Sequence, residues 1–353
     1  MKRSPHRIEL LYSMGISSQL EVLDLRHFSA AQLQPLLLEE ADRWQRRLYW
    51  DYSGSTSVLL KYLDSRVLPG FVALHHGKIA GYAFAVFEAA KAVLGDIYAF
   101  GEGQGPNNPV SETLLVHLLD MLLAAPGVDR IESQLLMFPA GSLAEPFAGR
   151  GFVPYPRLFM VADLNAAKDP ASAGRLPAGI ELEPWQPGLY DSAAELIHLS
   201  YLGHVDSGIN DQYRSIHGAQ RFLHNIIRFP GCGTFAPENS WVLRSTRSRE
   251  LLGIILCSRV RDDAAHVTQL CISPSLRGLG LGPALLRHCI AQIARQGVRS
   301  LSLTVTESNE AARRLYEQQG FETVHRFDAM VWDEAHTART RFRSADFRIP
   351  AIV

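Results

Sequence analysis

The sequence lacks long apolar runs, an excess of one charge and the cysteine patterns that carry chemistry. Its 353 residues include 35 Lys and Arg against 36 Asp and Glu, a formal net charge of −1. Because positive and negative side chains are nearly equal in number, the sequence has no excess of positive charge that would attract nucleic acid or a membrane surface. We expect neither as a partner. No segment approaches the ~20 apolar residues of a membrane-spanning helix. Glu9, Tyr12 and Ser13 interrupt the first apolar stretch, unlike a signal peptide, so a cytoplasmic location is expected.

The four cysteines, Cys232, Cys257, Cys271 and Cys289, form no CxxC pair and no Cys/His spacing typical of a metal site. Three of them fall in strand-like or helix-like runs, where a buried thiol acts as a small hydrophobic side chain. The segment 201–230 holds several His and Asp residues, but again without a recognisable metal spacing. We therefore predict no bound metal, no disulfide and no cysteine nucleophile.

Length and composition favour two domains. A hydrophobic fraction of 47% over 353 residues is enough to form two cores of ordinary size. The sharpest change in composition is the stretch 165–179, which is rich in Ala, Pro and Gly and has no aromatic residue. We expect a tail at 1–17, a first domain at 18–164, a linker at 165–179, a second domain at 180–336 and a tail at 337–353.

The two halves repeat the same order of strand and helix patterns. Each begins with a strand pattern and a helical one, continues with two strand patterns around a turn, and ends with Gly-Phe and a last strand pattern. Equivalent landmarks lie 160, 172 and 169 residues apart: Leu20 and Ile180, Gly81 and Gly253, Gly151 and Gly320. A near-constant offset over several landmarks indicates duplication of one α/β domain.

The most informative segment is Ile272–Gly282, ISPSLRGLGLG, which lies between a buried-strand pattern and a helical pattern. Its alternating glycines allow a turn whose N–H groups point inward and can hold anionic oxygens. Pro283 suits the first position of the following helix, whose N-terminal dipole would face the same turn. Arg277 adds a positive charge. The combination predicts a site for a phosphate-bearing ligand.

A dinucleotide site is one alternative for this turn, and with it a dinucleotide-dependent oxidoreductase. Glu307 lies roughly where such a site needs an acidic residue after the next strand. The glycine pattern is unfavourable, because Gly278, Gly280 and Gly282 alternate instead of following G-x-G-x-x-G, and proline comes next. Binding of NAD(P) would support this alternative.

Two motifs in the second half resemble the GNAT superfamily of N-acetyltransferases. Arg277–Gly282 is similar to its acyl-CoA signature, Q/R-x-x-G-x-G/A. Asn309–Phe321 resembles its second motif, N-x-x-A-x-x-L-Y-x-x-x-G-F. The resemblance is close from about residue 240 to 325 and only architectural over 18–165. It implies an α/β (α+β) fold of two tandem GNAT-like domains, each a twisted, mixed, mostly antiparallel sheet flanked by helices.

The resemblance also implies roles for individual residues. The pyrophosphate of acetyl-CoA would be held by the backbone of Arg277, Gly278, Leu279, Gly280, Leu281 and Gly282. Its pantetheine arm would pair like an added strand with Leu270, Cys271 and Ile272. Asn309 would bond the arm, and Tyr316 would protonate the leaving thiolate. For Tyr316 the alternative is an aromatic residue that only packs in the core, and for Arg277 it is a solvated turn charge.

His266 is the candidate general base. Some histone-acetylating relatives carry a glutamate at this place, six residues before the position of Ile272, and histidine can serve because it titrates near neutrality. The alternative is a structural histidine at the surface or at a strand edge. Glu307 and Ser308 are further candidates, although Ser308 is better suited to capping the next helix.

The first half does not preserve the glycine turn. Its equivalent stretch, Gly101–Pro109, keeps glycines but contains an acid, two prolines and no arginine, which disfavours a phosphate. We therefore expect a degenerate first domain and a second domain that binds acetyl-CoA as co-substrate. The predicted function is direct transfer of an acetyl group to an amine of a small molecule or peptide. A non-catalytic acyl-CoA-binding or regulatory module is the alternative, and the oligomeric state is open.

Overall fold

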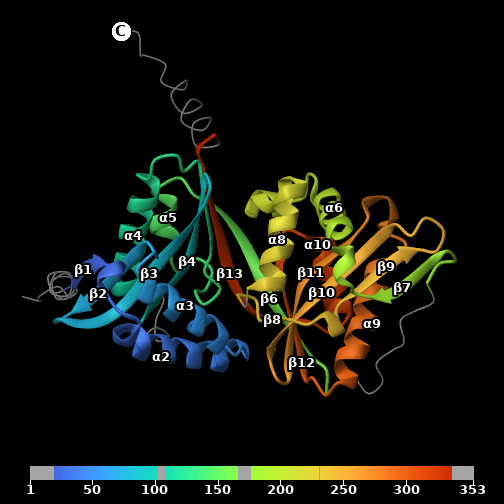
Figure 1. Ribbon diagram of the computed structural model, residues 1–353, viewed down its shortest axis with the longest axis horizontal. Coiled ribbons are helices and arrows are strands. Elements are labelled where there is room, and N and C mark those ends of the chain that lie inside the picture. Colours follow the sequence, from blue (N-terminus) through green and yellow to red (C-terminus); the bar gives the residue numbers. More distant parts are fainter. Residues whose placement is uncertain (1–19, 102–107, 166–175, 230, 336–353) are drawn as a thin grey trace, which may run out of the picture. The chain divides into compact units, whose positions relative to one another are not determined.

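A computed structural model describes residues 20–101, 108–165, 176–229 and 231–335 (Figure 1). Both expected tails, most of the expected linker and residues 102–107 of the glycine-rich stretch in the first half lie outside the described residues. Within the described ranges, no helix combines the length and the apolar character needed to cross a membrane.

The described residues form two compact units. The N-terminal unit contains residues 20–40, 56–154 and 328–335, and the C-terminal unit contains 41–55 and 155–327. These units differ from the linear division expected at 165–179, because each takes residues from the other half of the sequence.

The N-terminal unit is a sheet with helices packed against it. Its strand order is β1-β2-β3-β4-β5-β13, in which β4 and β5 are parallel and the other neighbours antiparallel. The elements of the first half of the chain are β1 (Leu20–Asp24), η1 (Leu25–His27), α2 (Ala30–Leu48), α3 (Ser53–Ser65), β2 (Gly70–His75), β3 (Lys78–Glu88), β4 (Lys91–Ala99), α4 (Pro109–Leu123), β5 (Arg130–Gln134), α5 (Ala144–Ala148) and β6 (Val153–Asp163).

Helix α4 builds much of the core of the N-terminal unit. Its fully buried side chains recur three and four residues apart, which places them on one face of the helix: Leu114, Leu115, Leu118, Leu119 and Leu122. Each buried leucine contributes roughly 1.5–3 kcal/mol relative to an exposed one. The amphipathic pattern of this segment therefore explains both the helix and its position on the sheet.

The C-terminal unit is also a mixed sheet flanked by helices. Its strand order is β6-β12-β11-β10-β9-β7, with β8 also paired to β10; only β11 and β12 are parallel. The elements of the second half are β7 (Ile180–Pro184), η2 (Pro187–Leu189), α6 (Tyr190–Tyr201), α7 (Asp206–Ile209), η3 (Asp211–Arg214), α8 (Ile216–Arg228), β8 (Thr234–Phe235), η4 (Pro237–Asn239), β9 (Trp241–Ser245), β10 (Leu251–Arg261), β11 (Ala264–Ile272), η5 (Pro274–Leu276), α9 (Leu281–Arg295), β12 (Ser300–Thr306), α10 (Glu310–Gln318) and β13 (Glu322–Asp333). The predicted α/β class is confirmed.

The two halves exchange their last strands. Strand β6, which ends the first half, pairs with β12 of the second half from Thr306↔Arg157 to Ser300↔Asp163. Strand β13, which ends the second half, pairs with β5 of the first half. A strand pattern predicts that a segment joins a sheet, but it does not say which of two similar edges it joins. That choice explains why the compact units are not linear segments.

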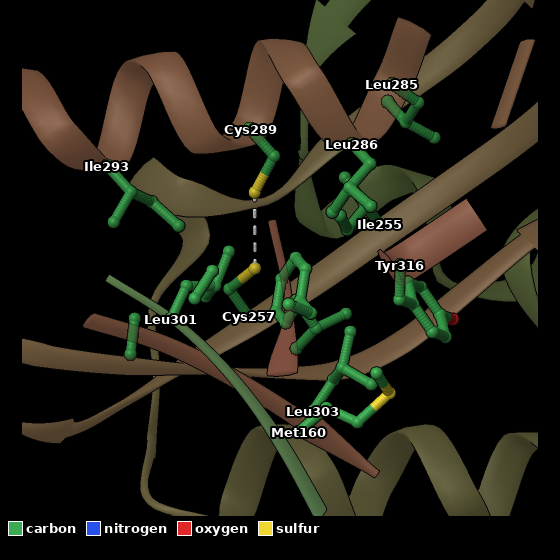
Figure 2. Close-up of a cluster of buried hydrophobic side chains, with 14 of the residues drawn as sticks. Met160, Ile255, Cys257, Leu285, Leu286, Cys289, Ile293, Leu301, Leu303 and Tyr316 are labelled. Atoms are coloured by element: carbon green, nitrogen blue, oxygen red, sulfur yellow. Dashed lines mark hydrogen bonds between the residues drawn. The ribbon is translucent and has the colours of Figure 1, made fainter. Parts of the chain in front are cut away.

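Helix α9 covers one face of the C-terminal sheet. Its buried residues Leu285, Leu286, Cys289 and Ile293 point at the strands (Figure 2), in agreement with the helical spacing in the sequence. The Sγ atoms of Cys289 and of Cys257 on β10 lie 3.4 Å apart in this core. As predicted, these thiols act as small buried side chains. Gly297, with φ of 80°, follows the helix where a left-handed residue was expected.

Candidate active site

Strands β11 and β12 separate partway along their length, and this opens the candidate site. Their parallel pairing runs from Ala264↔Ser300 to Val267↔Leu303, while β11 continues to Ile272 and β12 to Thr306. The register between β10 and β11 shifts at the same level, so Thr268 is an extra residue on β11. Bulges of this kind re-aim a strand beside functional sites. Beyond the bulge, β11 pairs with β10 on one side and faces the opening on the other.

The glycine turn joins the end of β11 to α9. Gly278 and Gly280 have φ of 81° and 75°, in the left-handed region that favours glycine. Helix α9 begins at Leu281, two residues before the start expected from Pro283. The first N–H groups of a helix have no partner within it, and the helix dipole makes this end positive. The turn is therefore suited to present backbone donors to an anion, and its role as a phosphate site stays a prediction.

A pocket of about 650 Å³ lies between the separated strands and this turn. Its volume is typical of a site for a small molecule or a cofactor. The predicted donor-binding residues in its lining are Leu270, Cys271, Ile272, Arg277, Gly278, Gly280, Leu281, Gly282, Asn309 and Tyr316. Leu279 is not in the lining, and its side chain is 57% exposed, so only its backbone is suited to the expected role.

Arg277 holds the turn to helix α6. Its Nη2 donates a hydrogen bond to the backbone carbonyl of Ser200, 2.5 Å away near the C-terminus of α6. The negative end of the helix dipole favours a cation there. Arg277 is exposed in the turn, but this bond ties it to α6, and it lines the pocket.

Tyr316 lies on α10 between the core and the pocket. Its ring packs in the core, 5.9 Å from that of Phe321, while Figure 2 shows its hydroxyl oxygen at the edge of the cluster. Among the described residues, this hydroxyl has no hydrogen-bond partner. Burial raises the pKa of Tyr316, and the nearby carboxylate of Asp206 raises it further, so the phenol stays protonated at neutral pH. The packing alternative and the acid role are thus both compatible with one side chain.

Cys271 lines the pocket from β11. Burial raises the pKa of its thiol to about 11, so the thiol is neutral near physiological pH. A neutral thiol is a poor nucleophile. The environment of Cys271 therefore favours a reaction without a covalent cysteine intermediate.

Asn309 begins helix α10 as its N-cap. Its Oδ1 accepts a hydrogen bond from the N–H of Ala312 at 3.2 Å, and its Nδ2 lies 3.2 Å from Nε2 of His204. The amide is thereby held at the pocket wall, in contact with the segment that follows α6. The capping role expected for Ser308 belongs to Asn309.

His266 is placed differently from the expectation for a general base. It is buried on β11, its imidazole 5.0 Å from Trp50 and 6.0 Å from Phe159 by ring centroids, and its Nδ1 bonds Ser302 at 2.9 Å. It is not in the pocket lining. Burial lowers its pKa to about 3, with the charge of Arg157 acting in the same direction. These contacts fit a structural histidine in the core, neither at the surface nor at the pocket.

Three side chains gain importance from the structure: His204, Asp206 and Thr306. The sequence placed the first two only among the His and Asp residues of the segment 201–230. Both line the pocket, and Thr306 donates a hydrogen bond to Oδ1 of Asp206. A His-x-Asp pair directly after a helix was the available signal, but no spacing rule connects it to β12. Within the described part of the chain, no group of three or more His, Cys, Asp or Glu is arranged to hold a metal ion.

Comparison with known proteins agrees with this geometry. Residues 209–321 match the acetyltransferase (GNAT) family. The chain is 38% identical over 82 residues to the [ribosomal protein bS18]-alanine N-acetyltransferase of Haemophilus influenzae, which is 23% of this chain and 55% of that protein. The chain thus spans about half the length of this relative. The match shows that residues 209–321 are similar to the GNAT family, and the predicted resemblance is confirmed.

Two solved structures share the fold over most of the chain. A GCN5-related N-acetyltransferase from Sphaerobacter thermophilus has a TM-score of 0.59 at 18% identity, covering 89% of this chain and 96% of that one. A tandem GNAT protein from the clavulanic acid biosynthesis pathway has a TM-score of 0.57 at 14% identity, covering 90% and 99%. Identities this low show the fold alone. They confirm the predicted tandem GNAT-like architecture.

Proposed function

We propose that the chain is an acetyl-CoA-dependent N-acetyltransferase whose donor site is the pocket of the C-terminal unit. The observation that carries the proposal is the separation of β11 from β12 beside the glycine turn. It brings a strand edge that β12 does not cover, a positive helix end and the hydroxyl of Tyr316 around one pocket. An extended thioester ligand with a pyrophosphate needs these three features together.

In the proposal, acetyl-CoA binds in this pocket as follows. The N–H groups of Gly278–Gly282 hold the pyrophosphate, and the edge of Leu270–Ile272 that faces the pocket pairs with the amides of the pantetheine arm. The thioester then lies beside Tyr316. When the amine attacks the carbonyl carbon and the carbon–sulfur bond breaks, the phenol donates its proton to the thiolate.

The acceptor is an amine of a small molecule or peptide. The relative from Haemophilus influenzae is named for acetylating an alanine of a ribosomal protein, which makes an N-terminal amine one candidate. The near-neutral charge of this chain gives no preference for a strongly basic partner. A cytoplasmic location, where such acceptors are available, stays part of the proposal.

The test is turnover by the full-length chain. Acetyl-CoA is incubated with a panel of amines: a peptide with N-terminal alanine, free lysine, spermidine and glucosamine. Release of free CoA is measured against a sample without amine. Amine-dependent release of CoA supports the enzyme. Tight CoA binding without turnover on any amine would favour the non-catalytic acyl-CoA-binding module, and protection from thermal unfolding by NAD(P) but not by CoA would favour the oxidoreductase.

A further inference from the structure

The pocket contains a second chemical group besides the donor cradle, the pair His204 and Asp206. The two residues lie where α6 ends and α7 begins, and both line the pocket together with Tyr316. We propose that His204, oriented by Asp206, is the base that takes the proton from the attacking amine. The inference deepens the proposed N-acetyltransferase function and rests on it.

The carboxylate of Asp206 is held by a hydrogen bond from strand β12. Thr306, at the end of β12, is 1% exposed, and its hydroxyl donates to Oδ1 of Asp206. The other oxygen, Oδ2, lies 3.8 Å from Nδ1 of His204. A carboxylate anchored on one oxygen thereby faces the imidazole with the other.

Asn309 determines which ring nitrogen of His204 carries the lone pair. Because its Oδ1 caps α10, the donor group Nδ2 faces Nε2 of His204. Nε2 is then the acceptor, and the proton of the neutral ring lies on Nδ1, toward Asp206. The backbone N–H of Asp206 also lies 3.2 Å from Nδ1 and opposes this tautomer. A neutral ring satisfies one of these two contacts. The proposal uses the tautomer whose Nε2 is free to accept a proton, with Nδ1–H facing Oδ2 of Asp206 at 3.8 Å, which is beyond hydrogen-bond range.

The resemblance implies that the amide of Asn309 also bonds the pantetheine arm. Its Nδ2 carries two hydrogens, so one can face the arm while the other faces Nε2 of His204. Asn309 therefore lies between the proposed donor site and the proposed base.

The other titratable groups in the pocket lining are less suited to this role. Burial raises the pKa of Tyr201 and of Tyr316, and it raises that of Cys271 to about 11, so all three are protonated near neutral pH. Arg277 and Arg314 are permanently charged donors. The side chain of His204 is 24% exposed and so can exchange protons with solvent.

The proton transfer balances with the acyl transfer. The amine nitrogen forms a bond to the thioester carbon and releases its proton to Nε2 of His204. The carbon–sulfur bond breaks, and the thiolate takes the proton of Tyr316. The products are the amide and free CoA. Transfer of the proton from His204 through solvent to the phenolate restores both side chains.

The test compares His204→Gln with His217→Gln in the full-length chain, on the amine that the wild type acetylates best. His217→Gln makes the same chemical change outside the pocket lining. His217 is exposed on α8 and bonds Gln220. We expect kcat of H204Q to fall by about 100-fold or more, as for loss of a general base. The Kd for CoA should stay within about threefold, roughly 0.65 kcal/mol. H217Q should retain the wild-type kcat.

Two further variants separate catalysis from a structural role. External imidazole should restore part of the turnover of His204→Ala, because a diffusible base can fill the vacated space. Asp206→Asn should lower kcat less than H204Q does, because in the proposal Asp206 only orients His204 and does not itself accept the proton. The inference is overturned if H204Q turns over normally, if H204Q loses CoA binding, or if imidazole restores nothing in H204A. Absence of turnover in the wild type on every amine would instead defeat the proposed function itself.

Discussion

The guanidinium of Arg277 donates a hydrogen bond to the backbone carbonyl of Ser200, with Nη2 and O 2.5 Å apart. The two residues are 77 positions apart in the sequence. The bond joins the glycine turn that would hold the pyrophosphate to the helix end that precedes His204 and Asp206. One arginine therefore connects the two walls of the pocket, which makes it more than a local positive charge.

Charge reversal at Arg277 tests this connection. In Arg277→Glu a carboxylate would face both the Ser200 carbonyl and the phosphates, and both contacts would become repulsive. We expect CoA affinity to fall by at least about tenfold, or 1.4 kcal/mol, in calorimetric titration. Arg247→Glu is the matched control, because Arg247 is exposed in the turn after β9 and outside the pocket lining. Unchanged affinity in R277E would refute the assignment of the turn to the donor.

Removal of one oxygen from Tyr316 tests the proposed acid. Phenylalanine keeps the ring in the core beside Phe321 and deletes only the hydroxyl at the pocket. We expect kcat of Tyr316→Phe to fall by about 100-fold or more, while the Kd for CoA stays unchanged. The control is Tyr190→Phe, whose hydroxyl bonds the carbonyl of Gln220 away from the pocket. A Y316F enzyme with wild-type kcat would leave Tyr316 as a packing residue.

Cys271 tests whether transfer is direct. Its thiol lines the pocket but is held protonated, so we expect kcat of Cys271→Ala to stay within about tenfold of wild type. Double-reciprocal plots of the initial rate, with one substrate varied at several fixed concentrations of the other, should give intersecting lines, as a ternary complex requires. Parallel lines, together with an acetylated Cys271 in mass spectra and loss of turnover in C271A, would establish a covalent intermediate instead.

His266 should make stability depend on acidity. The unfolded chain binds a proton near the ordinary histidine pKa of about 6.5, whereas the folded chain stays neutral at this site down to about pH 3. The contribution of His266 to the free energy of unfolding is therefore fully present above pH 6.5 and is lost as the pH falls toward 3. At pH 5 the loss is roughly 2 kcal/mol.

The measurement is urea unfolding of wild type and His266→Gln between pH 7 and pH 4. Glutamine does not ionise in this range, so the variant should lose less stability on acidification. Only the difference between the two slopes is informative, because the substitution also changes packing. Identical slopes would show that His266 is not neutral in the folded chain at low pH.

Local features of the donor site could be predicted from the sequence because their causes are local. Gly278 and Gly280 adopt the positive φ that glycine favours, and α9 follows them with its apolar residues on one face. Asn309 and Tyr316 fall on the next helix at the expected places. The start of α9 at Leu281 was missed by two residues, because a Pro after Gly is compatible with more than one position in the first turn.

The general base could not be placed in the same way. His266 matches a position that carries an acid in some relatives, but Trp50 and Phe159 arrive from distant segments and bury it. His204 meets Asn309 across 105 positions, and Thr306 meets Asp206 across 100. Pairings at such separations depend on how helices and strands pack, and no pattern in a single sequence encodes them.

The sequence by itself determined the α/β class, the repeated order of elements and the glycine turn, because periodicity, glycine conformation and helix dipoles act within a few residues. Only the tertiary structure decided that β6 and β13 exchange between the halves, that His266 is buried and that His204 faces the pocket. Strand edges and core contacts are chosen by the burial and pairing available across the whole fold. That difference in range separates the donor site, visible in the sequence, from the proposed base, visible only in the folded chain.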